Sequence, residues 1–303
     1  MPLDAVFIAC YRHDVHYARA CAASVRFFDR NIPLWLLKDR RYGEFSTRDI
    51  ELGMGAKVYP LQLRSYGWGF AKLEPLFDPA AGRFLYLDAD TLLAGPVLDW
   101  LAASPEDFVV SREPASPEFI NTNYYDLAAL QRLDPDFHYP GYTFNTGQWV
   151  GRGGLLTRAD FADLVDWTEP PHVRPENIFR LGEQGLLNYV LVRGAEAGRW
   201  TLRAEPFLCV PNTPEGAALE LSQISRGPDS PYRLIVHWCG LRTPEFRNAP
   251  RGDLLQFFEK FFYAVIGGDW LRLRHRAQRA VVSLRGLLRQ WFKPPIPAGA
   301  AKS

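Results

Sequence analysis

The chain has 303 residues, enough for one large α/β domain or two small ones with a substantial core. Hydrophobic residues make up 47% of it and charged residues 23%, the composition of an ordinary soluble globular protein. Because the net charge is only +1, we expect no nucleic-acid partner.

The first residues and the cysteines bear on the cellular location. Residues 1–6 lack a charged leader followed by an apolar core, so we expect no cleaved signal peptide, and no segment reaches transmembrane length. Cys10, Cys21, Cys209 and Cys239 are scattered without Cys-x-x-Cys spacing. This pattern argues against a zinc site or disulfide framework and predicts a cytoplasmic protein.

The first part of the chain alternates predicted strands (5–10, 34–37, 56–59) with predicted helices (15–28, 46–52). Asp14 is a candidate cap for the first helix, and Gly53 is expected to end the second. This order predicts parallel neighbouring strands with right-handed crossovers. No Gly-x-Gly-x-x-Gly or Gly-Lys-Ser follows the first strand, so dinucleotide-binding and P-loop proteins are weak alternatives.

Two aspartates follow an apolar run at 84–87, which is typical of a strand buried on both faces. In strand geometry Asp88 and Asp90 point the same way from the carboxyl end, where open α/β sheets bind ligands. Hard cations such as Mn²⁺ or Mg²⁺ accept carboxylate and diphosphate oxygens, so the pair predicts a metal site for a nucleotide substrate. A surface turn with a helix cap is the alternative.

The middle of the chain carries further candidate motifs. Lys72 follows a loop rich in glycine and aromatic residues, Asn145 lies in an alternating strand at 142–151, and Glu183 and Gln184 begin a helix. Residues 113–139 are predicted to be a binding loop or small subdomain, and 169–175 a proline-rich loop. The other elements expected are helices at 97–102 and 158–167, the latter capped by Thr157, and strands at 108–111 and 199–207.

A later apolar strand, 234–237, ends at His237, whose imidazole could complete a metal site begun by two carboxylates. Each candidate also has a structural interpretation. His237 could be a core residue, Tyr11 a half-buried loop aromatic and Lys72 a solvated helix lysine. Asn145 could be an amide bonded to backbone, and Glu183 an acid favoured by the helix dipole.

Taken together, these motifs resemble the GT-A glycosyltransferases, especially the retaining family 8 type that includes glycogenin and bacterial lipopolysaccharide galactosyltransferases. The resemblance rests on the segment from Arg83 to Pro96, on Phe70-Ala-Lys-Leu, Phe144-Asn-Thr-Gly and Glu183-Gln-x-x-Leu-Asn, and on His237-x-x-Gly. It implies a GT-A fold, a Rossmann-like α/β architecture with a mostly parallel central sheet and flanking helices, in a single domain at 1–268.

The resemblance also implies an activity and a set of site residues. The activity is metal-dependent transfer of a hexose from a nucleotide sugar, expected to be a UDP-sugar, to a carbohydrate, lipid-linked sugar or protein acceptor, with retention. The implied roles are Mn²⁺ or Mg²⁺ ligation (Asp88, Asp90, His237), base contacts (Ala9, Tyr11), other donor contacts (Lys72, Asn145, Gly240) and reaction beside the anomeric carbon (Glu183, Gln184).

Two positions depart from the resembled pattern. Glu183 stands where the family usually has Asp, and the lysine expected after Gly240 is missing, with Arg242 as its candidate substitute. A nucleotidyltransferase acting on sugar phosphates is one alternative function. The other is an inactive protein that binds sugar nucleotides or serves as a membrane scaffold.

The C-terminal part is predicted to be a basic amphipathic extension. A helix at 254–265 should end at Gly267, and from Trp270 onward the chain has eight Lys or Arg residues and no Asp or Glu. An apolar stripe runs from Trp270 to Trp291. We expect 269–303 to lie on an anionic membrane surface, which would place the protein at the inner face of the membrane; packing on the domain is the alternative.

Overall fold

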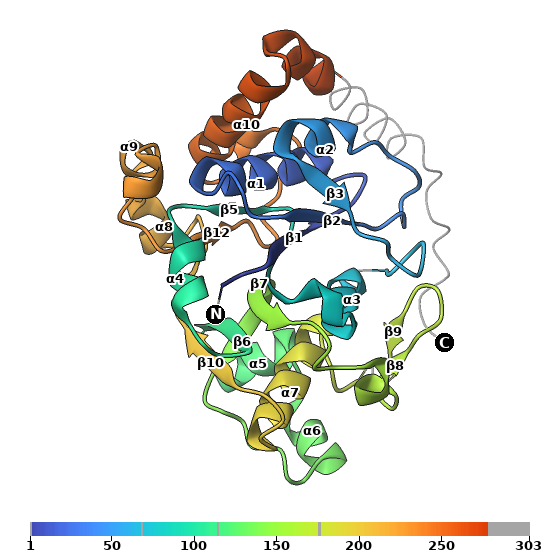
Figure 1. Ribbon diagram of the computed structural model, residues 1–303. Coiled ribbons are helices and arrows are strands. Elements are labelled where there is room, and N and C mark those ends of the chain that lie inside the picture. Colours follow the sequence, from blue (N-terminus) through green and yellow to red (C-terminus); the bar gives the residue numbers. More distant parts are fainter. Residues whose placement is uncertain (1, 68, 114, 175–176, 278–303) are drawn as a thin grey trace, which may run out of the picture.

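A computed structural model, shown in Figure 1, describes residues 2–67, 69–113, 115–174 and 177–277. Its centre is a seven-stranded sheet in the order β10-β6-β7-β4-β1-β2-β3. Only β7 runs antiparallel to its neighbours in this sheet, which confirms the predicted mostly parallel α/β architecture. The strands are β1 (Ala5–Cys10), β2 (Leu34–Lys38), β3 (Ala56–Val58), β4 (Arg83–Leu87), β6 (Phe108–Glu113), β7 (Thr143–Arg152) and β10 (Leu202–Glu205).

Helices cover both faces of this sheet (Figure 1). One face carries α1 (Val15–Phe28), α2 (Arg48–Met54) and α10 (Gly252–Ile266), and the other carries α3 (Glu74–Phe77) and α7 (Glu183–Glu196). Successive side chains of β4 enter two different cores: Leu85 and Leu87 pack on the α1 side, and Phe84 and Tyr86 pack on the α7 side. Strand β4 is therefore buried on both faces, as its apolar run predicted.

Two smaller sheets complete the strands. In one, β12 (Ile235–His237) lies between β11 (Leu208–Cys209) and β5 (Thr91–Leu93), and it runs antiparallel to β5. The other is the pair β8 (Val165–Asp166) and β9 (His172–Val173). The β12–β5 pairing joins segments that are far apart in the sequence, and it places the strand before His237 beside the residues that follow Asp90.

The remaining helical segments are short. They are the α-helices α4 (Val97–Ala103), α5 (Pro117–Asn123), α6 (Leu127–Leu133), α8 (Pro214–Ala218) and α9 (Leu221–Ile224), and the 3₁₀ turns η1 (Phe70–Leu73), η2 (Pro79–Ala81), η3 (Arg158–Phe161), η4 (Gly227–Asp229) and η5 (Phe246–Asn248). Helices α5 and α6 lie within 113–139, and Ser116 and Asp126 cap their first turns. This segment is therefore partly helical rather than an open loop.

Several expected boundaries were wrong for local reasons. Helix α2 continues through Gly53 and ends before Gly55, because Gly55 adopts the left-handed conformation (φ 61°). The helix expected at 158–167 is only the turn η3, since Val165 leaves to pair in β8; Thr157 does begin it, donating to Asp160. The loop expected at 169–175 contains the short strand β9, and the strand expected at 199–207 is limited to β10, which ends at Glu205.

The chain continues beyond α10 into a second helical segment at 269–277. Arg272 and Arg276 of this segment bind the Glu259 carboxylate of α10 at 3.0 and 2.8 Å, whereas Trp270 is 70% and Leu273 64% exposed. The predicted stripe beyond residue 277 lies outside the described residues. Among those described, no helix is long and apolar enough to cross a membrane.

Candidate functional site

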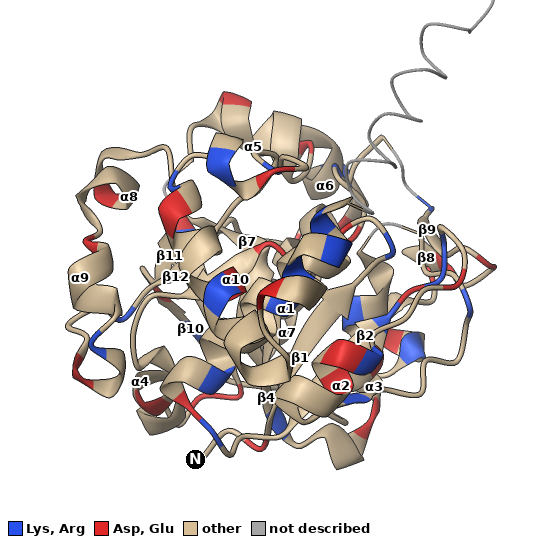
Figure 2. Ribbon diagram, turned by 90° about the horizontal axis from the view of Figure 1, so that it is seen from above, with Lys and Arg blue, Asp and Glu red and all other residues tan. Residues whose placement is uncertain are grey.

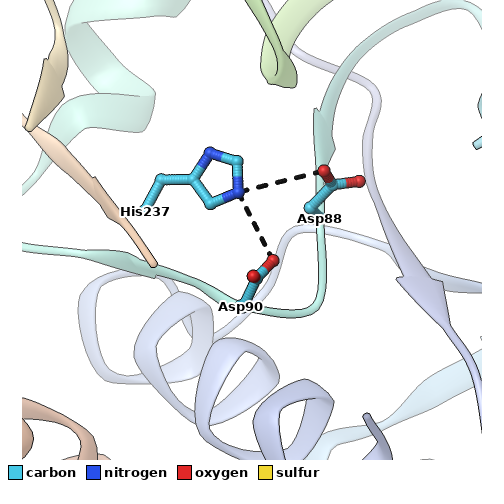
Figure 3. A group of neighbouring side chains, drawn as sticks. All are labelled: Asp88, Asp90 and His237. Carbon is cyan, nitrogen blue, oxygen red and sulfur yellow. Dashed lines mark ion pairs between the residues drawn. The ribbon is translucent and has the colours of Figure 1, made fainter. Parts of the chain in front are cut away.

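Three side chains that are distant in sequence converge at the carboxyl end of β4. His237 Nε2 lies 3.4 Å from Asp90 Oδ1 and 3.9 Å from Asp88 Oδ2 (Figure 3). One potential ligand atom from each residue lies within 4.8 Å of the other two. The structure thus brings together the three residues predicted to bind a metal.

A tight turn and a strand pairing create this convergence. The Asp88 carbonyl accepts hydrogen bonds from the Thr91 N–H (3.2 Å) and hydroxyl (2.8 Å), so the chain turns sharply between the two aspartates. Thr91 then pairs with His237 across β5 and β12, and the Trp238 N–H donates to the Asp90 carbonyl. The two carboxylates therefore converge through a turn, and not through the extended geometry that the sequence suggested.

Gly147 of β7 packs directly against this cluster. A Cβ at that position would lie 2.2 Å from His237 Cε1 and 2.8 Å from Asp88 Oδ2, far inside contact distance. The Asn145 side chain accepts the Gly147 N–H at 2.8 Å and so fixes the backbone there. Glycine at 147 is therefore required for the imidazole and the carboxylate to occupy their places.

Charge governs the protonation of the cluster. Burial by itself lowers the pKa of His237, but the neighbouring Asp90 and Asp88 carboxylates outweigh burial and raise it above its ordinary value. Burial raises the pKa of Asp90, but His237 and Arg242 lower it overall. His237 Nδ1 is buried and has no hydrogen-bond partner among the described residues. The protein thus keeps opposite charges close together at the bottom of a cleft.

The donor set fits a divalent cation. Carboxylate oxygens with one imidazole nitrogen are ligands that suit Mn²⁺ or Mg²⁺, whereas structural zinc sites are rich in thiolate ligands. Octahedral bonds of about 2.1 Å separate neighbouring ligand atoms by about 3 Å, so the 3.4 and 3.9 Å spacings require only a small contraction. The space that a Cβ at position 147 would fill is kept open beside these atoms.

A second charged group adjoins the first. Lys72 Nζ lies 2.9 Å from Glu183 Oε1, 3.5 Å from Asp88 Oδ1 and 3.0 Å from the Thr146 carbonyl oxygen, and Lys72 is only 3% exposed. Burial lowers its pKa, but Asp88 and Glu183 outweigh burial and raise it. At Glu183, by contrast, burial outweighs the nearby Lys72 ammonium and raises the pKa of that carboxyl. Lys72 therefore links the candidate metal centre to the start of α7.

These groups line a cleft of about 500 Å³ that contains every site residue predicted from the sequence: Ala9, Tyr11, Lys72, Asp88, Asp90, Asn145, Glu183, Gln184, His237, Gly240 and Arg242. The Tyr11 hydroxyl accepts the Gly69 N–H at 3.1 Å, and Gln184 Nε2 donates to the Asn123 carbonyl at 3.2 Å. Lys72 is not a solvated helix lysine. The Asn145 side chain accepts a hydrogen bond from the backbone, as its alternative structural role predicted, and it also lines the cleft.

No protein-family model matches the chain, and no curated protein matches it significantly. Solved structures do. The chain has a GT-A glycosyltransferase fold. It superposes on the galactosyltransferase LgtC, solved in complex with donor and acceptor sugar analogs, with a TM-score of 0.57 and 17% identity over 87% of this chain and 97% of that one.

Two other structures share this GT-A fold. The bifunctional glycosyltransferase WbbM gives a TM-score of 0.58 at 12% identity over 91% of this chain, and this chain spans only 52% of WbbM. The glycosyltransferase GlyE of Streptococcus pneumoniae TIGR4 gives 0.51 at 19% identity, over 97% of this chain and 66% of GlyE. At such identities the likeness defines the fold, as the sequence resemblance predicted.

The sequence patterns gave no site role to several further residues that line the cleft or support its floor. Asp14, Glu113, Thr146 and Cys239 line the cleft, and Gly147 supports its floor. Glu113 accepts the Tyr124 hydroxyl at 2.7 Å, and burial raises the pKa of its carboxyl. The Asn-Thr-Gly motif could have identified Gly147. The sequence pattern indicated Asp14 only as a helix cap.

Proposed function

We propose that the chain is a glycosyltransferase that moves a hexose from a UDP-sugar to an acceptor hydroxyl with retention of configuration. The observation that carries the proposal is the Asp88–Asp90–His237 cluster, which lies in one cleft with the Lys72–Glu183 pair, at the carboxyl end of the sheet. The fold shared with LgtC supports it.

Asp88, Asp90 and His237 would hold the divalent cation in this proposal. Such an ion, when bound, offsets the negative charge of the departing nucleoside diphosphate. Tyr11 and Ala9 lie at the end of β1, where they would contact the uracil base. Asn145 faces the same cleft from β7 and would orient the sugar.

Glu183 and Gln184 would line the face on which the acceptor attacks. Glu183 is fixed by Lys72 and faces Thr146, which suits it to orient hydroxyl groups of the sugar. Two exposed apolar side chains, Phe119 (46%) and Leu181 (56%), border the same part of the cleft. Apolar surface beside polar groups is suited to the face of a sugar ring, so this wall is the proposed acceptor side.

The two alternative functions predict different behaviour. A nucleotidyltransferase would need a basic, glycine-rich loop after β1, but residues 11–14 are Tyr-Arg-His-Asp. An inactive protein that only binds sugar nucleotides would take up UDP without releasing it from any UDP-sugar.

The test is to measure Mn²⁺-dependent UDP binding by calorimetry and UDP release from a panel of UDP-hexoses with candidate sugar acceptors. Asp90→Asn removes one ligand charge with little change of shape, so UDP binding should lose its Mn²⁺ dependence and UDP release should cease. Asp136→Asn, at a carboxylate that is 86% exposed, is the control. Equal Mn²⁺-dependent UDP affinity in Asp90→Asn and the wild type would contradict the assignment.

We also propose that the protein binds the surface of an anionic membrane. A cavity of about 770 Å³ between α2, the end of α10 and residues 269–277 has the exposed side chains Leu52 (75%) and Val265 (53%) at its edge. Arg48 and Arg274 also line it, and neither has a carboxylate partner among the described residues. Figure 2 looks onto this side and shows basic and acidic residues interspersed over its helices.

Apolar side chains beside guanidinium groups that have no carboxylate partner among the described residues suit anionic phospholipids, because the acyl chains contact the apolar side chains and the phosphates contact the guanidinium groups. The full chain should therefore sediment with phosphatidylglycerol vesicles, and Leu52→Asp should weaken this binding without altering UDP affinity. Leu133→Asp on α6, at a side chain that is 47% exposed, is the matched control. Equal vesicle binding by both variants and the wild type would exclude this surface.

A further inference from the structure

Arg242, in the loop that follows β12, is held between two carboxylates. Its Nη1 lies 2.5 Å from Asp14 Oδ2, and its Nε lies 3.3 Å from Asp90 Oδ2. Its Nη2 has no partner among the described residues. The Arg242 side chain is 38% exposed and lines the cleft, so a ligand in the cleft can contact it.

Among the described residues, Arg242 is the only hydrogen-bond partner of the Asp14 side chain. Asp14 is the residue before the first turn of α1, yet its side chain makes no capping hydrogen bond, contrary to the sequence expectation. One turn later, the Tyr17 hydroxyl accepts the Thr243 N–H at 2.9 Å and lies 3.2 Å from the Thr243 carbonyl. Because Tyr17 already fixes the backbone of the loop, the hydrogen bond that Asp14 accepts serves to hold the Arg242 side chain.

Asp90 uses its two oxygens differently. Oδ1 faces His237 at 3.4 Å, inside the candidate metal centre, while Oδ2 faces Arg242. A positive charge is thus held at the rim of the metal centre without occupying the oxygen that lies nearest His237. Guanidinium N–H groups bind phosphate oxygens with defined geometry, and a nucleoside diphosphate coordinated at this centre would lie within their reach.

We propose that Asp14 is a positioning residue that holds Arg242 with Nη2 directed at the diphosphate of the nucleotide donor. The inference rests on the proposed function. It assigns Asp14 a role in recognising the diphosphate rather than the base or the sugar. It also gives Arg242 two opposite effects, because the same charge that attracts the diphosphate repels a cation bound to Asp90.

The first test uses this opposition. In Arg242→Ala, Mn²⁺ measured alone by calorimetry should bind severalfold more tightly than in the wild type, because a neighbouring positive charge is gone. UDP measured at saturating Mn²⁺ should bind at least about tenfold more weakly, since a charge-assisted hydrogen bond is lost. Uridine, which lacks phosphate, should bind both proteins equally.

The second test separates Asp14 from the stability of the loop. Asp14→Asn should weaken UDP binding by about three- to tenfold and leave uridine binding unchanged, and Asp14→Glu should restore most of the UDP affinity. In the double variant, Asp14→Asn should add nothing to Arg242→Ala, since it acts only through that side chain. Arg12→Ala, at an exposed guanidinium bonded to the Tyr42 carbonyl, is the control.

The outcomes are distinct. One outcome is that the wild type binds UDP and Asp14→Asn binds it equally well. Another is that the affinities for UDP and for uridine fall together with the melting temperature. Either result would show that the Asp14–Arg242 ion pair only attaches the loop after β12 to α1. In that case the inference is wrong and the proposed function stands. If the wild type binds no UDP at any Mn²⁺ concentration, the proposed function itself fails.

Discussion

Glu183 and Glu259 are buried to the same degree, at 4% and 3% exposure, on helices that cover opposite faces of the central sheet. Each is bound by basic side chains: Lys72 contacts Glu183, and Arg272 and Arg276 contact Glu259. Burial and ion pairing therefore do not distinguish a functional acid from a structural one.

The partners of the two acids distinguish them. Lys72 also lies 3.5 Å from Asp88, so Glu183 is coupled to the candidate metal centre and lines the cleft. The arginines that bind Glu259 come from the helical segment that follows α10, so this cluster attaches residues 269–277 to the domain. We infer that the first cluster serves the reaction and that the second serves stability.

The largest expected effect is in the first cluster. Glu183→Gln removes the carboxylate nearest Lys72, so the ammonium group should shift toward Asp88 and disturb a metal ligand. UDP release from a UDP-sugar should fall by roughly 10² to 10³-fold, the range seen when a preorganised electrostatic group is removed. Turnover equal to that of the wild type would show that Glu183 is as purely structural as Glu259.

The reciprocal change is Glu259→Gln, which should leave UDP affinity unchanged and lower the free energy of unfolding. Two arginines lose their shared charged acceptor, but Arg276 is 37% exposed and can be solvated, so we expect a loss of about 1–3 kcal/mol. Urea denaturation measures it, with Asp253→Asn at the exposed start of α10 as the control. A large loss of UDP binding in Glu259→Gln would show that the Glu259 cluster does not serve stability alone.

Gln184, the neighbour of Glu183, tests how far the functional cluster extends. If this side chain acts only near the reacting carbon, Gln184→Ala should lower turnover about tenfold or more while UDP affinity changes little, because interactions made in the transition state appear in the rate. Steady-state kinetics together with UDP calorimetry would decide this. Weakened UDP binding at unchanged turnover would point to donor docking instead.

The smallest effect is a dependence of stability on pH. The pKa of His237 in the folded protein is raised above its usual value near 6.5, so its stabilising contribution is fully present below that pH and is lost as pH rises through the folded-state pKa. Metal-free protein should therefore lose stability over that interval.

Urea denaturation at a series of pH values measures this loss. His237→Gln should flatten the profile, and Glu259→Gln should keep it, because Glu259 binds Arg272 and Arg276 of the segment that follows α10. A profile in His237→Gln that matches the wild type would assign the titration to another group.

The sequence predicted the fold where local pattern and burial agree. The apolar runs of β1 and β4 are buried on both faces, and the helical spacing of 15–28 appears as α1. Prediction failed where a tertiary pairing overrode the local pattern. Val165 pairs in β8 instead of extending a helix, and nothing in the local pattern marks 91–93 as the partner of β12.

For the candidate site, too, some features were predictable from the sequence and others depend on the tertiary structure. The sequence alone determined which residue types could bind a cation, because Asp88 and Asp90 directly follow a buried strand and His237 ends another. Only the tertiary structure decided that one turn and the β5–β12 pairing bring them together, and that Gly147 leaves room for them. It also decided that Asp14 holds Arg242 instead of capping α1, since that choice depends on a contact 228 residues away in the chain.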